Sequence, residues 1–340
     1  MIVEGFPDRS ININGEDYLY FGGTSYLGIT TNPEFQQILF SCIKKWGTFY
    51  GSSRNANVKL SVYNKFEDLF AKQVNSEASL TTSSGTLAGR LVTNYLSKTI
   101  SSFYHHPKTH PAVLVEGSLP LFIENKLNPR LLNNKEEDIV ITIDAVLSLE
   151  VIPTSFSFLD QIATTKKVTL VIDESHSLGI VGKQGEGVFS TVLNKKLHRK
   201  IMISSLGKAL GLSGGVIAAD KNFINTIKNE PLFISSSGAN PAYLNAYLLS
   251  QNIFKSQHKK LKKNLEFLFK DLVLGLTFKY HKNYPVIYSQ ENNIYERLLS
   301  KGIVITNFKY PTYKGEMNRI VITANHTNDD LDKLKYLLSN

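Results

Sequence analysis

Short runs of apolar residues recur through the middle of this 340-residue chain, separated by stretches with helical spacing. Five of these runs are predicted to be buried strands: residues 112–115, 139–143, 168–172, 201–203 and 216–219. Runs that are apolar throughout are typical of strands covered on both faces, whereas half-exposed strands alternate. The pattern therefore predicts an α/β fold with a mostly parallel central sheet and helices on both of its faces.

The N-terminal segment has a different pattern. Ile11 and Ile13 alternate with polar residues before the turn Asn14-Gly15, and residues 18–21 complete a predicted hairpin. Asn32 then stands as a cap before a predicted helix that runs to Trp46, because apolar residues recur there at helical spacing. Further helices are predicted over residues 62–74 and 87–96.

The C-terminal third is predicted to form a smaller α+β unit. A long helical stretch covers residues 241–272, and strands are expected at 285–288, 303–306 and 319–323. Acidic residues after Asn328 favour the start of a final helix there. We expect three parts: an N-terminal arm and helix (1–50), a large domain (51–240), and a long helix with a small C-terminal domain (241–340).

The composition is that of an ordinary folded protein, with 42% hydrophobic and 20% charged residues. The only cysteine, Cys42, excludes an intrachain disulfide and fits a reducing compartment. The first residues lack the basic and apolar regions of a signal peptide, and no run of ~18 or more apolar residues is present. We therefore expect a cytoplasmic protein without a membrane span.

The net charge is +9, and lysines are concentrated between residues 255 and 282. These lysines alternate with apolar residues such as Leu261 and Leu265 at helical spacing, which is typical of a solvated helix face. Nucleic-acid binding is not indicated, because it needs base-stacking or groove-reading elements beside the basic residues.

Candidate chemistry begins where the run 168–172 ends. Asp173 follows the run, His176 comes three residues later, and Lys208 stands 35 residues beyond Asp173 (208 − 173) in a loop of small residues. A strand-end acid followed by such a lysine is the layout of a pyridoxal 5′-phosphate (PLP) site, in which lysine forms the Schiff base. The acid faces the ring nitrogen and keeps it protonated, since opposite charges favour each other's charged forms. Taken singly, Asp173 could equally cap a helix, and Lys208 could be a solvated loop residue.

Several segments, in the same order along the chain, resemble the α-oxoamine synthase family of fold-type I PLP enzymes. Asp173-Glu174-Ser175-His176-Ser177-Leu178-Gly179 is similar to the family's D-E-A-H-S/G-x-G box, and residues 206–211 are similar to its lysine loop. Residues 18–28, residues 51–54 with Glu67, and residues 319–331 are similar to three further family segments. The resemblance extends along most of the chain and implies a fold-type I PLP-dependent transferase whose large domain binds PLP.

The resemblance also implies the roles of the site residues. Lys208 would be the general base, Asp173 the partner of the ring nitrogen, and His110 the histidine that stacks on the ring. Arg319 would bind the carboxylate of an amino-acid substrate in bidentate geometry, although a structural ion pair is the alternative. The other cofactor-binding residues would be Ser84, Gly85, Thr86 and Ser205 at the phosphate, Ser148 and His176 at the phenolic oxygen, and Ser236 and Ser237, which would reach the phosphate of a neighbouring subunit.

Two of these assignments have open alternatives. Ser84, Gly85 and Thr86 could form a simple hydroxyl-rich helix cap. His105 and His106 lie close to His110 and leave the register of the stacking histidine open. A metal site is not predicted, because these histidines have no acidic or cysteine partners at ligand spacing.

The activity that the resemblance implies is a decarboxylating condensation of an amino acid with an acyl-CoA, in a homodimer with shared active sites. The positive charge of the chain would help to recruit the anionic CoA. Thr24, Tyr63 and Thr86 stand where the family has asparagine, histidine and an aromatic residue, which leaves the substrate open. The alternatives are an aminotransferase of the same fold and a non-catalytic subunit, and the presence of Lys208 argues against the latter.

Overall fold

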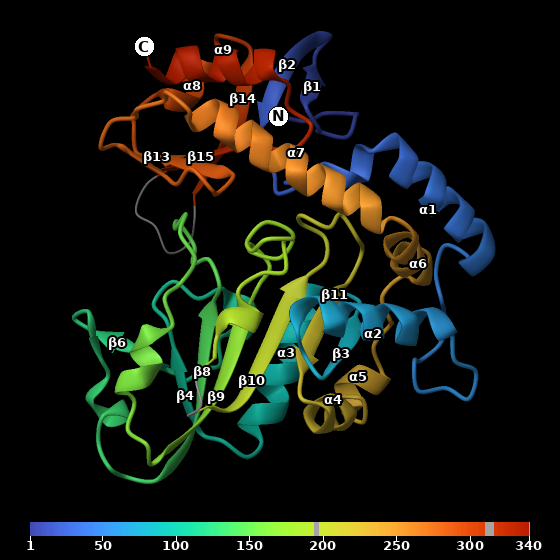
Figure 1. The fold of residues 1–340 in the computed structure, drawn as a ribbon, viewed down its shortest axis with the longest axis vertical. Helices are drawn as coiled ribbons and strands as arrows, with labels where there is room; N and C mark the ends of the chain where they lie inside the picture. Colours follow the sequence, from blue (N-terminus) through green and yellow to red (C-terminus); the bar gives the residue numbers. More distant parts are fainter. Residues whose placement is uncertain (194–196, 310–315, 340) are drawn as a thin grey trace.

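The computed structural model describes all residues except 194–196, 310–315 and 340, and it arranges them around two large sheets, with one additional two-stranded ribbon (Figure 1). The middle of the chain forms the larger sheet, in the lower part of the view. The smaller sheet lies in the upper part, where both termini are found. Helix α7 (Gln251–Phe269) runs diagonally across the upper part.

The larger sheet confirms the expected, mostly parallel architecture. Its strands lie in the order β3 (Ala78–Thr82), β11 (Gly215–Ala219), β10 (Leu197–Ser205), β9 (Lys166–Asp173), β8 (Glu137–Asp144), β4 (Ser102–His105) and β5 (Leu119–Pro120). All pairs from β10 to β5 are parallel, and β11 is antiparallel to both of its neighbours. The predicted strands at 139–143, 168–172, 201–203 and 216–219 lie within this sheet.

The predicted strand at 112–115 is wrong. The segment Pro111–Val113 forms a 3-10 helix (η2), and the strand beside β8 is β4, which comes earlier in the chain. Pro111 has no N–H to donate to a strand ladder, and at the first position of a helical turn this loss carries no penalty. His110 caps the turn, because its Nδ1 accepts the N–H of Ala112 at 3.2 Å.

Both faces of the larger sheet are apolar, because successive residues of its strands enter two different cores. Ile141 and Ile172 belong to one core, whereas Val140 and Val171 belong to the other. The second core is closed by α3 (Gly85–Ser97) and α4 (Lys221–Ile227), and α2 (Ser61–Val74) packs against β3. Burial of a side chain of this size contributes about 1.5–3 kcal/mol, so the continuous apolar runs determine that the sheet is covered on both sides.

The smaller sheet joins the two ends of the chain. Its order is β1 (Ser10–Ile13), β2 (Glu16–Phe21), β14 (Ile303–Lys309), β15 (Glu316–Val321), β13 (Val286–Ser289) and β12 (Phe278–Tyr280). The predicted hairpin is confirmed as β1 and β2, and β2 pairs in parallel with β14, Leu19 lying opposite Ile303. Arg9 donates to both carboxylate oxygens of Asp330 at 2.6 and 2.9 Å, which ties the arm to α9 (Asn328–Ser339).

The predicted long helix over residues 241–272 is interrupted. Helix α6 (Pro241–Leu249) ends at Ser250, and α7 begins at Gln251. Helix α6 is apolar on nearly all sides and packs against α1 (Pro33–Trp46) and α2, whereas α7 buries only one face. The two helices also have different neighbours, since α7 contacts α9. The cap of α1 is confirmed, since Asn32 Oδ1 accepts the N–H of Phe35 at 3.0 Å.

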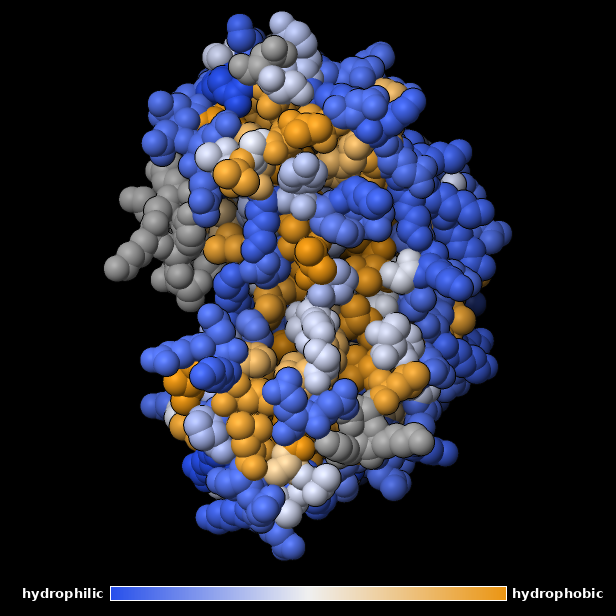
Figure 2. Space-filling view, turned by 60° about the vertical axis from the view of Figure 1, so that its left-hand side comes forward, coloured by the Kyte–Doolittle hydropathy of each residue, from blue (hydrophilic) through white to orange (hydrophobic). Residues whose placement is uncertain are grey.

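Short elements complete the fold: α5 (Pro231–Ile234), α8 (Ile294–Leu299), β6 (Phe122–Ile123), β7 (Lys126–Leu127), η1 (Ile29–Thr31), η3 (Pro129–Leu131), η4 (Ser157–Gln161) and η5 (Phe189–Thr191). Within the described part of the chain, no helix combines the length and the apolar character that crossing a membrane requires. On the face shown in Figure 2, hydrophobic side chains gather along the middle of the molecule, between hydrophilic ones.

Candidate active site

The site lies at the carboxyl ends of the central strands, where ligands of parallel sheets bind. Asp173 is the last residue of β9 and is 6% exposed. Its Oδ1 accepts the N–H of Ser175 at 2.8 Å, and the Ser175 hydroxyl in turn accepts the N–H of Ser205 at the end of β10. These hydrogen bonds connect the end of β9 to the strand that leads into the lysine loop.

Lys208 and His176 meet at this edge of the sheet. The amine Nζ of Lys208 lies 2.8 Å from Nε2 of His176. Burial lowers the pKa of Lys208, and the carboxyl groups of Asp173 and Asp144 oppose this shift. Burial also lowers the pKa of His176 well below its ordinary value, so its imidazole is neutral.

Asp144 belongs to this site, although it was not predicted. It is the last residue of β8, lies opposite Asp173 in the strand register and is 5% exposed. Burial and the charge of Asp173 raise the pKa of Asp144 well above its ordinary value. Its position after the apolar run 139–143 repeats that of Asp173 after 168–172, and this repeated pattern is the signal that identifies it in the sequence.

His110 lies beside Asp144 at this site. Its backbone N–H lies 3.2 Å from both carboxylate oxygens of Asp144. Partial burial lowers the pKa of the His110 imidazole, and the charges of Asp173 and Lys208 also act on it. The charged groups that act on His106 are instead those of Lys108 and Glu150. These contacts place His110, and not His106, beside Asp144 and Asp173, and the stacking role of His110 stays a prediction.

The predicted phosphate residues come together at the start of α3. A Cβ on Gly85 would lie 2.8 Å from the backbone N and Cα of Ser205, so the first turn of α3 touches the end of β10. Ser84 caps the helix by accepting the N–H of Leu87 at 3.1 Å. Within the described residues, the N–H groups of Gly85 and Thr86 have no acceptor. A helix start with free N–H groups and a nearby hydroxyl fits the phosphate of PLP.

Arg319 reaches the site from the smaller sheet. Its Nη2 donates to the carbonyl of Gly23 at 3.2 Å, and its buried Nε has no partner among the described residues. Its charge acts on both His176 and Lys208. A buried guanidinium N–H without an acceptor carries a free-energy penalty, which a bound carboxylate would relieve.

Ser236 and Ser237 make no hydrogen bond with Lys208 among the described residues of one chain. Ser148 lies in the turn after β8. The Ser236 hydroxyl donates to the carbonyl of Leu232 at the end of α5, and Ser237 is exposed. No group of three or more metal-binding side chains exists among the described residues.

Two acids that the motifs contain hold loops in place. Glu174, fully buried, accepts the N–H groups of Val188 and Phe189 at 2.9 and 2.6 Å. Glu67 pairs with Arg54 and accepts the N–H of Thr81 at 2.7 Å. Both carboxylates accept hydrogen bonds from backbone N–H groups. Glu174 and Glu67 are therefore structural members of their motifs.

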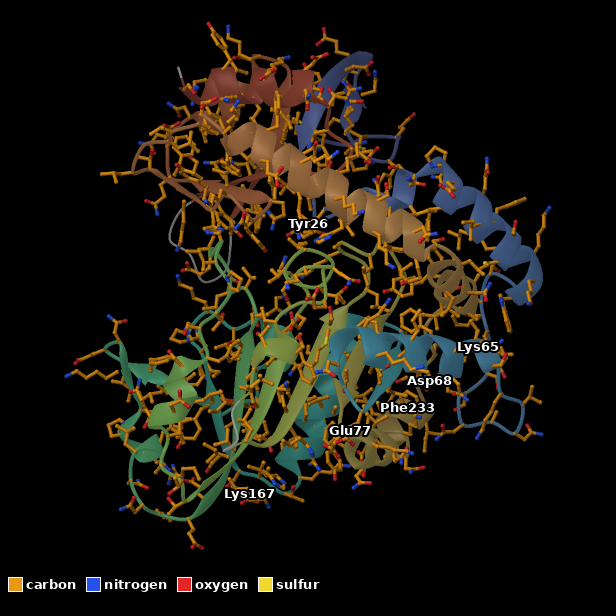
Figure 3. All side chains as sticks on the ribbon, viewed as in Figure 1. Tyr26, Lys65, Asp68, Glu77, Lys167 and Phe233 are labelled. Carbon is orange, nitrogen blue, oxygen red and sulfur yellow. The ribbon has the colours of Figure 1, made fainter. Side chains whose placement is uncertain are left out.

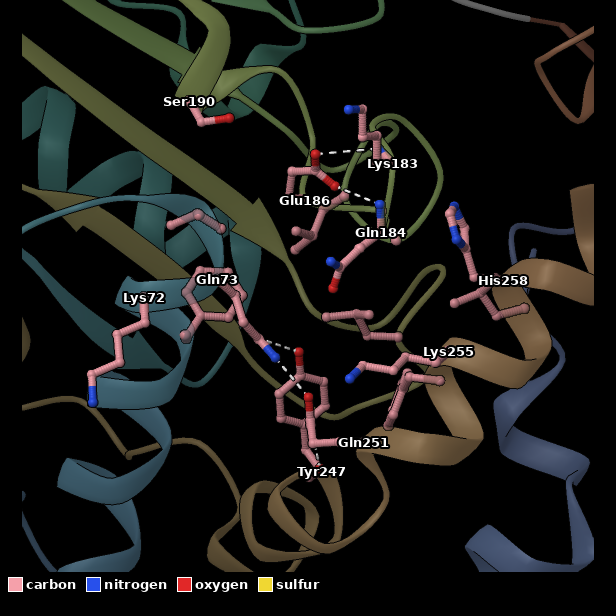
Figure 4. A pocket seen from close by; sticks show the side chains of 18 of the residues that line it. Lys72, Gln73, Lys183, Gln184, Glu186, Ser190, Tyr247, Gln251, Lys255 and His258 are labelled. Carbon is pink, nitrogen blue, oxygen red and sulfur yellow. Dashed lines mark hydrogen bonds between the residues drawn. The ribbon is translucent and has the colours of Figure 1, made fainter.

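A cavity of about 530 Å³ lies between the loops that follow His176 and Lys208 and the helices α2, α6 and α7 (Figure 4). Leu178 and Leu210, two residues beyond His176 and Lys208, line it. On its other side, Tyr247 donates to Gln73 and Gln73 donates to Gln251, each at 2.6 Å. None of the residues predicted to bind PLP lines this cavity, so it is separate from the cofactor site.

Comparisons with known proteins agree with this geometry. The model of the aminotransferase class I and II family matches residues 153–335, which include Asp173, His176, Lys208 and Arg319. The 8-amino-7-oxononanoate synthase of Buchnera aphidicola is 24% identical, with 98% of this chain and 91% of the relative covered. That of Petrotoga mobilis is 26% identical, with 97% and 90% covered.

Solved structures share the fold. The serine palmitoyltransferase of Sphingomonas wittichii has a TM-score of 0.82 at 15% identity, covering 99% of this chain and 90% of that chain. The 8-amino-7-oxononanoate synthase of Francisella tularensis has a TM-score of 0.69 at 23% identity, covering 95% and 97%. A serine palmitoyltransferase from S. paucimobilis, with a TM-score of 0.82 at 16% identity, is solved with PLP and myriocin bound.

These findings confirm the predicted fold-type I PLP transferase fold, the dependence on PLP and the resemblance to α-oxoamine synthases. The matching family model covers residues 153–335, just over half of the 340 residues. The chain therefore belongs to the aminotransferase class I and II family.

Proposed function

We propose that this protein condenses a small amino acid with an acyl-CoA thioester, with loss of carbon dioxide, to give an α-amino ketone and free CoA. The observation that carries the proposal is the convergence of Lys208, Asp173 and Arg319 from three different strands and loops on one site. PLP requires the lysine and the buried acid, and an amino-acid carboxylate fits the arginine.

The first candidate activity is that of an 8-amino-7-oxononanoate synthase, which would place the protein in biotin biosynthesis. Full-length relatives with this name, at 24% and 26% identity, support it. Activities like those of glycine C-acetyltransferase and serine palmitoyltransferase are the alternatives within the same reaction class.

Each site residue has a proposed task. PLP, when bound, supplies an electron sink that makes the Cα–H bond of the amino acid acidic. Lys208 Nζ takes the Cα proton as general base, and burial favours the neutral amine that this task needs. Asp173 would face the pyridine nitrogen and keep it protonated, and His110 would lie against the ring. Arg319 orients the substrate through its carboxylate.

The remaining predicted residues would hold the cofactor in place. We assign Ser84, Gly85, Thr86 and Ser205 to the phosphate, and Ser148 and His176 to the phenolic oxygen. The contact between α3 and the end of β10 supports the phosphate assignment, because it gathers N–H groups and hydroxyls from two elements.

We also propose a homodimer in which Ser236 and Ser237 serve the partner's site. Hydrogen bonds of 2.8, 2.7 and 2.6 Å join the segments around residues 48–55 and 228–240. Exposed apolar side chains lie on or beside these segments: Phe49, Val58, Leu232 and Ile234. Exposed apolar residues that are grouped in this way are typical of protein interfaces.

Complementation tests the shared site. One subunit would carry Lys208→Ala and the other Ser236→Ala with Ser237→Ala. If the serines serve the partner's site, the mixed dimer has one intact site and recovers activity above that of either parent. If the serines serve their own subunit, both sites of the mixed dimer are damaged and activity does not recover.

The reaction class is tested by measuring thiol release and keto-acid formation in parallel. We would screen alanine, glycine and serine against short, dicarboxylic and long-chain acyl-CoAs. A condensing enzyme releases CoA thiol only when both substrates are present. An aminotransferase instead converts an amino acid and a keto acid without a thioester, and this result across the panel would overturn the proposal.

We place the protein in the cytoplasm and propose no nucleic-acid partner. A single cysteine in 340 residues fits a reducing compartment, and the lysines of residues 255–263 lie mostly on the exposed face of α7. Cell fractionation with a tagged chain tests the location.

A further inference from the structure

One ion pair joins the part of the chain that carries the larger sheet, residues 51–240, to the smaller sheet. Glu150, in the turn after β8, contacts Lys279 of β12 with one carboxylate oxygen and Lys108 with the other. Among the described residues, every other ion pair lies either within residues 51–240 or outside this range. Opposite charges therefore hold the two parts together at Glu150 and Lys279.

Lys279 lies in the same row of the smaller sheet as Arg319. It stands opposite Tyr288 where β12 pairs with β13, and Tyr288 stands opposite Arg319 where β13 pairs with β15. Residues directly opposite each other in neighbouring strands point to the same face of a sheet. The face that carries Arg319 therefore also carries the lysine that reaches Glu150.

The position of Glu150 is fixed by a tight turn at the end of β8. Its N–H donates to the carbonyl of Leu147 at 3.0 Å, and Leu149 between them has a φ of 64°. This left-handed conformation is uncommon for leucine and persists only where the surrounding contacts hold it. The turn begins shortly after Asp144, so Glu150 is attached to the edge of the larger sheet that carries the site.

Glu150 is charged at neutral pH. Partial burial by itself would raise the pKa of Glu150, but Lys108 and Lys279 outweigh this effect and lower it. His106, a further titratable group close to Glu150, stays neutral because burial lowers its pKa to about 4. One carboxylate thus binds two ammonium groups, and such networks are more effective than isolated surface ion pairs.

The site lies between the two parts that this ion pair joins. The hydroxyl of Tyr26 lies 3.0 Å from Nδ1 of His176, and Figure 3 shows Tyr26 between the upper and lower parts of the molecule. Tyr284 donates to the backbone carbonyl of His176 at 3.0 Å. Lys208 belongs to the lower part and Arg319 to the upper part, so their separation depends on how the two sheets are held.

We propose that Glu150 and Lys279 are positioning residues, whose ion pair fixes the smaller sheet so that Arg319 meets the carboxylate of an amino acid bound near Lys208. The ion pair lies at one end of the row and the arginine stands two strands away. The role of Arg319 rests on the proposed function, whereas the ion pair is a property of the chain itself.

Cross-linking with a carbodiimide tests the contact, since this reagent joins a carboxylate directly to an amine that touches it. Peptide mapping of the cross-linked protein should find Glu150 joined to Lys279 and to Lys108, and not to Lys282. Lys282 is the matched control, because it is exposed in the turn after β12 and has no ion pair among the described residues. Absence of the product between Glu150 and Lys279 would overturn the proposal.

Binding of an amino acid tests the positioning role. The absorbance change of bound PLP on titration with alanine, glycine or serine gives a Kd. Lys279→Gln and Glu150→Gln should each raise this Kd about two- to fivefold, since fivefold corresponds to the ~1 kcal/mol of an exposed ion pair. The double variant should be no weaker than Glu150→Gln, because both changes break one contact. The differences should shrink at roughly 1 M salt, which screens exposed charges.

Lys282→Gln removes the same charge without breaking an ion pair and should leave the Kd unchanged. An equal Kd in Lys279→Gln and Lys282→Gln would overturn the positioning role. If none of the three amino acids binds, the role of Arg319 fails and the cross-link decides on the ion pair. Neither measurement uses an acyl-CoA, so failure of the proposed condensation is seen separately.

Discussion

Asp144 and Asp173 are cross-strand partners at the carboxyl ends of β8 and β9, and both are buried. Two carboxylates at this spacing do not both ionise easily, because each disfavours the charge of the other. The pKa of Asp144 is raised well above its ordinary value, by burial and by the charge of Asp173. We infer that Asp144 is the neutral member of the pair.

Neutral replacements should therefore affect the two acids differently. Asp173→Asn should lower turnover roughly a thousandfold or more. The Asp173 carboxylate would keep the pyridine nitrogen of PLP protonated, and each unit by which the pKa of that nitrogen falls costs about 1.4 kcal/mol. Asp144→Asn should stay within about tenfold of the unaltered protein, since the amide oxygen can still accept the N–H of His110. Steady-state rates and the absorbance of bound PLP measure both effects. Equal losses in the two variants would contradict the assignment of charge.

Lys208 is expected to bind PLP covalently. Borohydride reduction of the purified yellow protein, followed by peptide mapping, should place a phosphopyridoxyl group on Lys208. The 2.8 Å contact with His176 and the acids nearby make this amine different from the exposed lysines of the chain. Lys200, half-buried but bonded to the carbonyls of Phe189 and Val192, serves as an internal control. Labelling of a lysine other than Lys208 would refute the assignment.

Arg319→Ala should raise the KM for the amino acid at least tenfold, with less effect on the absorbance of bound PLP. The guanidinium would contact the substrate carboxylate and not the cofactor, so its loss weakens substrate binding first. The KM of Arg319→Lys should lie between those of the unaltered protein and of Arg319→Ala, because an ammonium group cannot bind a carboxylate in bidentate geometry. An unchanged KM in Arg319→Ala would show that the arginine is structural.

Gly85→Ala should weaken PLP binding about tenfold or more. The added Cβ would lie 2.8 Å from the backbone of Ser205, and backbone cannot move aside as a flexible side chain does. The start of α3 would shift away from β10, at a cost of about 1–3 kcal/mol in stability. Equilibrium titration with PLP measures the affinity. Gly275→Ala is the control, because nothing lies within 4 Å of its Cβ position.

Glu174 should make the protein less stable as the pH rises. Burial raises the pKa of Glu174 to about 7, above its ordinary value near 4.3 in an unfolded chain. Its contribution to stability is therefore fully present below pH ~4.3 and is lost as the pH rises to about 7, by roughly 3 kcal/mol. Glu174→Gln should flatten this loss, as thermal unfolding between pH 5 and 8 would show.

Glu186→Gln is the matched control for that measurement. Glu186 also accepts backbone N–H groups, from Lys183 and Gln184, but its pKa is lowered. The contribution of Glu186 to stability is present at higher pH and is lost on acidification. Glu186→Gln should therefore leave the loss of stability above pH 5 unchanged. A similar flattening in both variants would contradict the role assigned to Glu174.

The sequence by itself determined the features that depend on residues close together in the chain. Periodicity placed the central strands, the cap at Asn32 began α1, and the order Asp173, His176, Lys208 indicated the cofactor chemistry. These signals are strong because a strand end and its following loop are neighbours in sequence as well as in space.

Only the tertiary structure decided which distant segments meet. The pairing of β2 with β14, the contacts of Tyr26 and Tyr284 with His176 and the approach of Arg319 join residues that are far apart in the chain. No local period or cap encodes such contacts, because they arise from burial of whole elements against one another. The same holds for the turn at His110, where the missing N–H of Pro111 outweighed an apolar pattern typical of a strand.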